Sequence, residues 1–410
     1  MRSLSSRALA LPVAAALMPL LAACALAAAP PAAASGSDQG PHGFPGAGSG
    51  GALSAQTILS GSSLTHTFTV AGTSTTKTEQ LSDPDDITRL RHDIFVGFQN
   101  GVGPQGQASA DGNLDSTVVE LTTSGHVLTQ WDVAGKTDGV TGDRDTGMVI
   151  ATVNEDANSS LYAITPGAGG GVQHYQYNEP LPHNGGTDAI SVVNGRLYIS
   201  ASAPGTTGTL PAPQPTFPAV YSVALDSVHS VATVTPVFFD EDPATVANVG
   251  TSQSGQTVNL ALTDPDSNEV VPRHAPRFAG DFMLTSQGDL QQIFVSPWDH
   301  KLSVLNLTQS VDDTAWPDGG HGALYATDST NDTVDVVTGD FPSGPVVAVT
   351  PCGSNSAPAT CPAPPAFPAN SLGSLNPGTG QMTSLSVGGV ALVPQGGLLY
   401  MHERGNQGQR

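Results

Sequence analysis

Apolar residues beyond about Gln56 occur in short runs that are separated by clusters of Gly, Asn, Asp and Pro. Examples are Ile94-Phe95-Val96, Leu197-Tyr198-Ile199 and Val346-Val347-Ala348-Val349. No long stretch keeps the 3.6-residue apolar period of an amphipathic helix. The pattern therefore predicts an all-β chain of many short strands joined by turns.

The predicted strands form a repeat whose units open with an acidic residue followed by small and apolar residues. These openings are Asp86-Ile87, Asp138-Gly139-Val140, Asp188-Ala189-Ile190, Glu269-Val270 and Asp313-Thr314-Ala315. A sixth opening, Val390-Ala391-Leu392, lacks the acid. Three of the separations lie near the roughly 40–50 residues of a four-stranded propeller blade, and the two longer ones fit one blade plus an insertion.

Each opening is followed by a second apolar strand that ends in polar groups. The six second strands are Phe95–Asn100, Val149–Asn154, Leu197–Ser200, Phe282–Gln287, Leu324–Asp328 and Leu399–His402. In addition, Leu81-Ser82-Asp83-Pro84-Asp85 recurs as Leu262-Thr263-Asp264-Pro265-Asp266. The repeats predict a β-propeller of six blades, or of seven if Glu241–Leu262 forms a degenerate blade instead of an inserted hairpin.

The two ends of the repeat region are both incomplete. Val390–His402 supplies only two strands, while Gln56–Val70, including Leu64–Val70, supplies strands with no opening before them. We therefore expect the N- and C-terminal strands to share the closing blade.

One segment carries a family resemblance. Gly322–Val336, with the sequence GALYATDSTNDTVDV, resembles the NHL-type and gluconolactonase-like propeller repeat, in which a strand carries G-x-L-Y-x-x-D and an Asn-rich turn precedes the next strand. The resemblance implies radially arranged sheets whose faces are buried between neighbours.

The acidic openings are the candidate chemical site, because the innermost strand of each blade lines the central channel. Carboxylates gathered there repel one another unless protons or a cation neutralise them. We therefore consider Ca²⁺, a cation that prefers oxygen ligands, at a site formed by Asp86, Asp138, Asp188, Glu269 and Asp313, with help from Asn100, Asn154 or Asn268. In gluconolactonase-like propellers a central divalent ion activates water or the substrate carbonyl, and the resemblance implies a similar role. In the alternative interpretation, each acid accepts backbone N–H bonds in the turn between blades.

Three histidines are candidate general bases, because they lie near openings or strand ends. They are His183, His321 and, at the last strand, His402. Histidine titrates near neutral pH and can accept a proton there. The alternative is that they are solvated loop residues.

Charge limits the partners. The 410 residues include 13 Lys and Arg against 35 Asp and Glu, a formal net charge of −22, and lysine occurs only at Lys77, Lys136 and Lys301. Such a surface repels phosphate backbones, so nucleic acid and anionic membranes are excluded as partners, while cationic ligands are favoured. The acidity also serves solubility, which is the simpler explanation.

The N-terminus has the pattern of an export signal. Arg2 and Arg7 precede the uncharged Ala/Leu-rich stretch 8–34, which several prolines interrupt, so a cleaved signal is favoured over a membrane span. Leu21-Ala22-Ala23-Cys24 matches a bacterial lipobox whose cysteine would be lipidated, whereas cleavage after Ala32-Ala33-Ala34 would release the protein. We expect a signal peptide over 1–24, an Ala/Gly/Pro/Ser tether over 25–54, and one propeller domain over 55–410.

The two remaining cysteines fit an extracytoplasmic location. Cys352 and Cys361 lie in a Pro/Ala/Ser-rich segment, and an even pair in an exported chain predicts a disulfide. Without nearby histidines the pair does not have the pattern of a zinc site.

Two functions follow from these features. The first is an exported, lipid-anchored propeller, acting as a monomer, that binds an extracytoplasmic protein, glycan or small ligand. The second is a divalent-metal-dependent hydrolase or lyase of the gluconolactonase-like kind. The chain has no G-x-S-x-G, H-E-x-x-H, P-loop or strand-to-helix G-x-G-x-x-G motif, so serine hydrolases, zincins and nucleotide enzymes are disfavoured.

Overall fold

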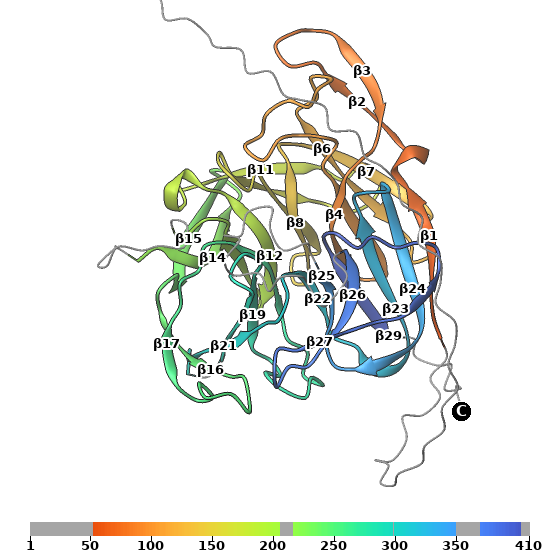
Figure 1. The fold of residues 1–410 in the computed structure, drawn as a ribbon. Helices are drawn as coiled ribbons and strands as arrows, with labels where there is room; N and C mark the ends of the chain where they lie inside the picture. The colour runs from red at the N-terminus through yellow and green to blue at the C-terminus, as the bar shows by residue number, and fades with distance from the viewer. Residues whose placement is uncertain (1–51, 206–215, 298, 350–369, 403–410) are drawn as a thin grey trace, which may run out of the picture. The chain divides into compact units, whose positions relative to one another are not determined.

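A computed structural model describes residues 52–205, 216–297, 299–349 and 370–402 (Figure 1). The predicted signal peptide, Cys24, most of the predicted tether, Cys352 and Cys361 lie outside these ranges. The described chain is all-β, as predicted, with two single-turn 3₁₀ helices, η1 (Gly61–Ser63) and η2 (Pro182–Asn184). Strand structure begins at Leu53, slightly before the expected start near Gln56.

The first blade has four antiparallel strands, ordered from the inside outwards. They are β4 (Pro84–Leu90), β5 (Asp93–Phe98), β6 (Asp115–Leu121) and β7 (Val127–Ala134). A separate two-stranded hairpin, β2 (Thr65–Thr69) and β3 (Thr76–Gln80), precedes this blade.

The second and third blades are joined at their outer strands. The second contains β8 (Thr137–Asp143), β9 (Met148–Val153), β10 (Ser160–Ile164) and β11 (Val172–Tyr177). The third contains β12 (Thr187–Val193), β13 (Arg196–Ala201), β14 (Pro218–Asp226) and β15 (Val231–Phe239). A short parallel pairing of β11 with β15 connects them into one sheet.

The fourth blade carries an insertion at its outer edge. Its four strands are β18 (Pro265–Val270), β19 (Phe282–Ser286), β20 (Gln291–Val295) and β21 (Leu302–Asn306). The inserted hairpin, β16 (Pro243–Val246) and β17 (Thr257–Asn259), pairs through β16 with β21. Glu241–Leu262 is therefore an added hairpin and not a seventh blade.

The chain between two strands of the fifth blade forms a hairpin of the closing blade. The fifth blade contains β22 (Val311–Ala315), β25 (Val346–Val349), β26 (Ser371–Leu375) and β27 (Met382–Ser384). Between β22 and β25 the chain leaves to form β23 (Asp318–Asp328) and β24 (Thr333–Ser343) of the closing blade. The closing blade is completed by β29 (Leu398–His402) inside, and by β1 (Leu53–Ser60) and β28 (Val387–Gly389) outside.

The closing blade thus contains both terminal strands, as predicted, but three details of the prediction are wrong. Val390-Ala391-Leu392 is not an innermost strand, and Leu399–His402 is innermost instead of second. Leu324–Asp328 belongs to the closing blade and not to the blade opened by Asp313. Leu64–Val70 contributes to the separate β2–β3 hairpin.

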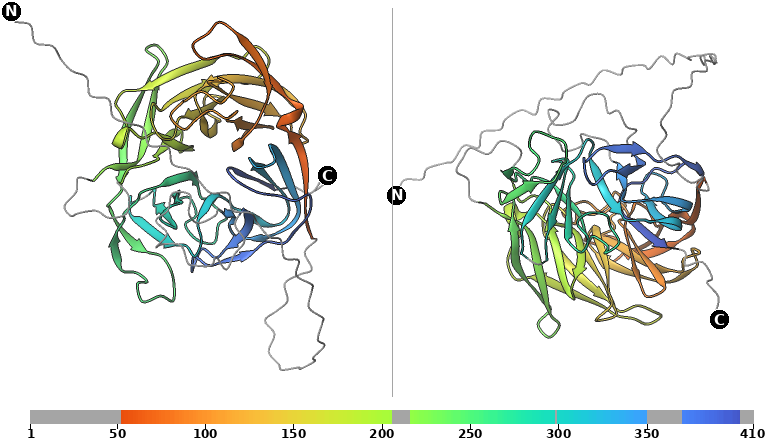
Figure 2. Two further views of the ribbon diagram at one scale, coloured as in Figure 1. Left: turned by 45° about the horizontal axis from the view of Figure 1, so that its top comes forward. Right: turned by 90° about the horizontal axis from the view of Figure 1, so that it is seen from below.

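The six innermost strands form a closed ring. In sequence, β4 contacts β8, β8 contacts β12, β12 contacts β18, β18 contacts β22, β22 contacts β29, and β29 contacts β4. Figure 2 shows the sheets following one another in this order. Within the described residues, the buried apolar side chains form six clusters, each between two neighbouring blades, which are the contacts that hold the ring together.

Candidate functional site

Five of the six inner strands begin with the same irregularity, a β-bulge. In β4, Pro84 pairs with Phe98 and Ile87 with Val96, so two residues of β4 oppose one residue of β5. The same shift occurs in β8, β12, β18 and β22. Every bulge therefore provides a first and a second bulge residue at an equivalent place in its blade.

The first bulge residue is aspartate in all five strands. We call these residues the aspartate ring: Asp85, Asp138, Asp188, Asp266 and Asp312. All five line one cavity of about 350 Å³. The closing blade places Gly396 and Gly397 beside them, directly before β29. One repeated backbone feature thus directs five carboxyl groups to one place.

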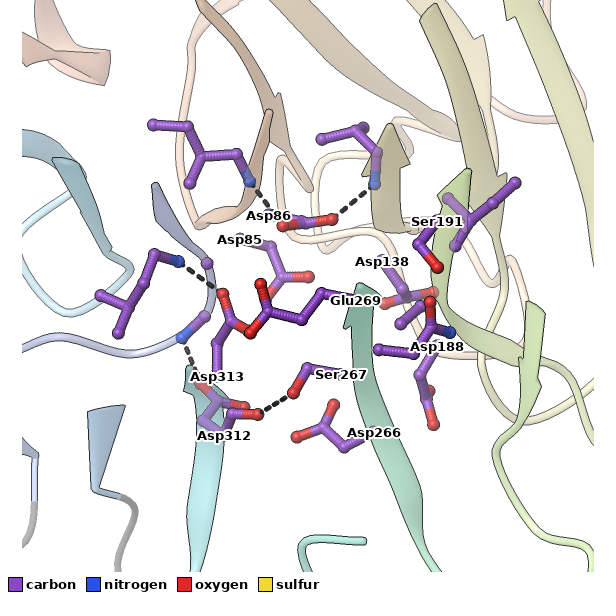
Figure 3. Close-up of a pocket in the computed structure, with 18 of the residues that line it drawn as sticks. Asp85, Asp86, Asp138, Asp188, Ser191, Asp266, Ser267, Glu269, Asp312 and Asp313 are labelled. Atoms are coloured by element: carbon purple, nitrogen blue, oxygen red, sulfur yellow. Dashed lines mark hydrogen bonds between the residues drawn. The ribbon is translucent and has the colours of Figure 1, made fainter. Parts of the chain in front are cut away.

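The second bulge residues connect neighbouring blades. Asp86 accepts the backbone N–H groups of Ile87 (2.7 Å) and of Val140 in the next blade (2.6 Å). Asp313 does the same with Thr314 (2.7 Å) and Leu398 (2.6 Å). These two carboxyl groups therefore have the turn-bonding role of the alternative interpretation, although both also line the cavity (Figure 3).

The remaining second bulge residues also lie at the junctions between blades. Ser267 donates its hydroxyl to the Asp312 carbonyl at 2.6 Å. At Gly139 an added Cβ would lie 2.6 Å from the Asp188 carbonyl oxygen. Small residues are needed here because the next blade approaches so closely.

Three further acids bring the carboxyl groups that line the cavity to ten. The additional residues are Glu155, Asp264 and Glu269. Glu269 accepts a hydrogen bond from the Trp316 indole at 2.8 Å. Against these acids stands one buried ammonium group: Lys136 contacts Asp138 at 3.1 Å and is also bonded to Glu155. The charge at the site is therefore far from balanced.

Burial and mutual repulsion raise the pKa of most of these carboxyl groups. Burial is the main cause for Asp264, whose pKa rises to about 6, for Asp313, to about 7, and for Asp85, to about 8. The pKa values of five others lie well above the ordinary range, again chiefly through burial: Asp86, Asp138, Asp188, Asp266 and Glu269. Burial would lower the pKa of Lys136, but the charges of Asp138, Glu155 and Asp85 raise it. At neutral pH the cavity thus holds protons that a cation can displace.

Amide side chains support part of the ring. Gln287 donates to Asp266 at 2.9 Å and to Asp312 at 3.1 Å, and Gln99 donates to Asp138 at 3.3 Å. Asp312 additionally accepts the Gly396 N–H. These bonds fix the carboxyl groups in position.

Three buried polar side-chain atoms of two residues that line the cavity lack hydrogen-bond partners. Asp138 is 6% exposed and its Oδ2 atom has none. Asn268 is 8% exposed, and neither its Oδ1 nor its Nδ2 atom has one. A buried polar atom without a partner costs about 1–3 kcal/mol, so a ligand that satisfies these atoms gains free energy.

The five predicted acids are brought together, but they occupy three different positions. Asp138 and Asp188 belong to the aspartate ring, whereas Asp86 and Asp313 are second bulge residues. Glu269 lies further along β18, two residues after the bulge. All five line the cavity.

The two asparagines at the ends of second strands serve the turns. Asn154 accepts the Lys136 N–H at 2.9 Å and donates to the Asn158 carbonyl at 3.1 Å. Asn100 accepts the Ser82 N–H and donates to Thr117. Neither lines the cavity.

The histidines lie away from the cavity. His183 contacts the Pro204 carbonyl at 2.9 Å and packs against Phe217. His321 on β23 lies 3.3 Å from Asp340 on β24, and His402 lies 3.1 Å from Asp318. The structure thus places these residues apart from the acidic site.

Sequence analysis missed three members of the ring, Asp85, Asp266 and Asp312, together with Glu155 and Asp264. The signal was present in the repeated Leu-x-Asp-Pro-Asp segment, because it aligns Asp85 with Asp266. Aligning all openings on that second aspartate would have found the complete ring.

Calcium fits the chemistry of the donors but not their spacing. Carboxylate and amide oxygens are suitable ligands. Within the described ranges, however, no three His, Cys, Asp or Glu side chains lie together in a way that could hold a metal ion. This spacing therefore assigns no chemical step to a bound metal ion.

Comparisons with known proteins leave the family open. No family model and no curated protein matches the chain. Among the residues that the structure describes, no helix has the length and apolarity needed to cross a membrane.

Several solved structures are similar in fold. A protein of unknown function from Bacteroides caccae shares 9% identity over 87% of this chain and 100% of its own, with a TM-score of 0.43. A Bacteroides uniformis protein provisionally assigned as a 6-phosphogluconolactonase shares 13% identity over 86% and 99%, with a TM-score of 0.40. Virginiamycin B lyase from Staphylococcus aureus shares 10% identity over 67% and 99%, with a TM-score of 0.30.

Proposed function

We propose that this chain is an exported binding propeller that holds a small ligand in its central cavity. The observation that carries the proposal is the aspartate ring: five equivalent bulges direct carboxyl groups into one cavity, where Asp138 Oδ2 and the side-chain amide of Asn268 have no hydrogen-bond partner. A merely structural centre would be expected to bury apolar side chains, because buried charges cost free energy unless paired.

A panel of ligands tests this proposal. Thermal unfolding of the mature chain is measured with cationic, neutral and anionic small molecules, for the wild type and for Asp188→Asn. The matched control is Asp145→Asn, an exposed acid outside the cavity. A ligand supports cavity binding if it raises the Tm of the wild type and of the control but raises the Tm of Asp188→Asn much less. Equal shifts in all three proteins, or none, contradict it.

The export part of the proposal rests on the N-terminal sequence alone. Lipidation at Cys24 would anchor the propeller to the outer face of the membrane. Mass spectrometry of the mature N-terminus tests this. A diacylglyceryl-modified Cys24 supports the anchor, and a free N-terminus near Ala34 indicates release instead.

A metal-assisted hydrolase or lyase is the second candidate function, and Glu269 favours it. This carboxyl group is buried at the cavity, is held by the Trp316 indole and has a raised pKa caused by burial and by Asp313. A buried, protonated carboxyl group can act as a general acid.

Lactone hydrolysis with and without a chelator tests the second candidate. Chelator-sensitive turnover that Glu269→Gln reduces 100-fold or more would support it, since general acid catalysis contributes about 10²–10⁴-fold. Turnover that is unchanged in Glu269→Gln would reject the assigned role.

A further inference from the structure

We propose that the cavity selects a small organic polycation, a molecule with two or more ammonium groups joined by a short hydrocarbon chain. This inference rests on the proposed function, since it names the ligand class of the same cavity.

The size and charge of the cavity favour an organic cation over a bare ion. A volume of about 350 Å³ is many times the roughly 10–15 Å³ needed to hold one water molecule. A single metal ion would fill little of it, and the described acids do not gather in threes around one point. The negative charge is instead spread around the cavity, which suits a ligand whose positive charges are also spread.

The carboxyl groups surround the cavity. Figure 3 shows the Glu269 and Asp313 carboxyl groups near one another, Asp138 and Asp188 grouped apart from them, and Asp85 and Asp266 at other places on the wall. Two ammonium groups joined by a spacer can contact carboxyl groups at two places on this wall at once.

Lys136 shows how the protein itself accommodates an ammonium group among these acids. Its side chain contacts Asp138 and Glu155, and the charge of Asp85 contributes to its raised pKa. Lys136 does not itself line the cavity, and none of the residues that do is a lysine or arginine. Asp188, Asp266 and Asp312 are therefore left for positive groups that come from a ligand.

Apolar residues next to the ring provide a surface for a hydrocarbon spacer. The residue that follows each bulge is Ile87, Val140 or Ile190 in the first three blades, and the closing blade contributes Leu398; all four line the cavity. Burying the methylene groups of a ligand against such residues contributes favourable free energy. The cavity thus combines acids with apolar contacts.

The unpartnered polar atoms give the ligand specific anchors. Asp138 Oδ2 can accept an ammonium hydrogen, and so can the Asn268 side-chain oxygen. Charge-assisted hydrogen bonds of this kind are stronger than those between neutral groups. Water or a small metal ion would also satisfy these two oxygen atoms, but neither would contact the apolar residues of the cavity.

Calorimetric titration tests the inference with defined probes. The mature protein is titrated with 1,4-diaminobutane and spermidine, and, for comparison, with 1-aminobutane, 1,4-butanediol and CaCl₂. Fluorescence of Trp316, which is bonded to Glu269 at the cavity, reports occupancy. We expect the diamine to bind at least 10-fold more tightly than the monoamine, with no detectable binding of the diol. Asp266→Asn should weaken diamine binding about 10-fold, while Asp145→Asn leaves it unchanged.

The outcomes separate the inference from the proposed function. If the monoamine or the diol binds as tightly as the diamine, or CaCl₂ binds and the diamine does not, the ligand class is wrong but cavity binding stands. If Asp266→Asn does not fold, the ligand series on the wild type still decides. If no probe binds, the inference is overturned. The proposed function falls as well only when the wider ligand panel also shows no shift that depends on Asp188.

Discussion

Asp85 and Asp86 are neighbours in the sequence and have the same side chain, yet the structure uses them differently. Asp85 belongs to the aspartate ring, close enough to Lys136 for the two charges to interact. Asp86 accepts two backbone N–H groups and connects the first blade to the second. The pair Asp312 and Asp313 repeats only part of the comparison, because both residues accept a backbone N–H of the closing blade, from Gly396 and Leu398 respectively.

The difference shows that the bulge assigns the roles, not the residue type. A regular strand alternates its side chains between two faces, and a bulge places one additional residue before the alternation resumes. Here the first bulge residue serves the cavity and the second serves the junction between blades. A substitution at the second position should therefore affect folding, and one at the first should affect charge and binding.

The largest expected effect is at the second bulge position. Asp86→Ala leaves the N–H groups of Ile87 and Val140 without their acceptor, and each such group costs about 1–3 kcal/mol. We expect the free energy of unfolding to fall by about 2–4 kcal/mol, measured by denaturant titration. Asp86→Asn, which keeps an acceptor oxygen, should lose less. A change in Asp86→Ala no larger than in the exposed control Asp145→Ala would contradict the assigned role.

A somewhat smaller effect is expected where the second bulge residue is glycine. In Gly139→Ala the new Cβ would lie 2.6 Å from the Asp188 carbonyl oxygen and 2.8 Å from the Ile190 nitrogen. Such overpacking costs about 1–3 kcal/mol. Gly171→Ala is the matched control, because nothing lies within 4 Å of its added Cβ. Equal Tm values for the two variants would show that the blades can move apart.

The smallest effect on stability is expected from charge changes among the acids of the cavity, and its sign is opposite. The folded-state pKa values of about 6 for Asp264, 7 for Asp313 and 8 for Asp85 exceed the ordinary value of 3.8. The folded protein therefore holds more protons than the unfolded chain, and its stability is full below about pH 4 and falls as pH rises towards 8.

Asp266→Asn removes one of these repelling acids. We expect its free energy of unfolding to exceed that of the wild type by about 1 kcal/mol at pH 8 and to equal it at pH 4. Denaturant titration at both pH values measures this difference. A wild-type stability that increases from pH 4 to pH 8 would contradict the electrostatic interpretation of the ring.

The fold could be predicted from the sequence because blades are local repeats. Runs such as Phe95–Asn100 and openings such as Asp138-Gly139-Val140 recur with each blade, and the inward position of Asp138 follows from that. The closing blade was the difficult part, since it combines β1, the β23–β24 hairpin and β29 from distant parts of the chain. No local pattern indicates that Leu324–Asp328 leaves the blade in which its neighbour Asp313 lies.

The site was predicted in its location but not in its register. Asp86 and Asp313 follow another aspartate, and a pattern based on the acid next to the apolar residue selects the second of the two. Which of the two is the first bulge residue and which is the second depends on the position of the bulge, a backbone feature that residue type alone does not specify. Glu155 comes from the end of a second strand and converges with Asp138 only in three dimensions.

The exchange of protons for a cation at the aspartate ring can be measured directly. Calorimetric titration of the wild type with 1,4-diaminobutane at pH 7, in two buffers of different ionisation enthalpy, gives the number of protons released on binding. We expect a net release, which becomes smaller in Asp266→Asn and stays unchanged in Asp145→Asn, because the ligand displaces protons from carboxyl groups whose pKa values are raised. Binding with the same enthalpy in both buffers, or with proton uptake, would contradict a cation site at the ring.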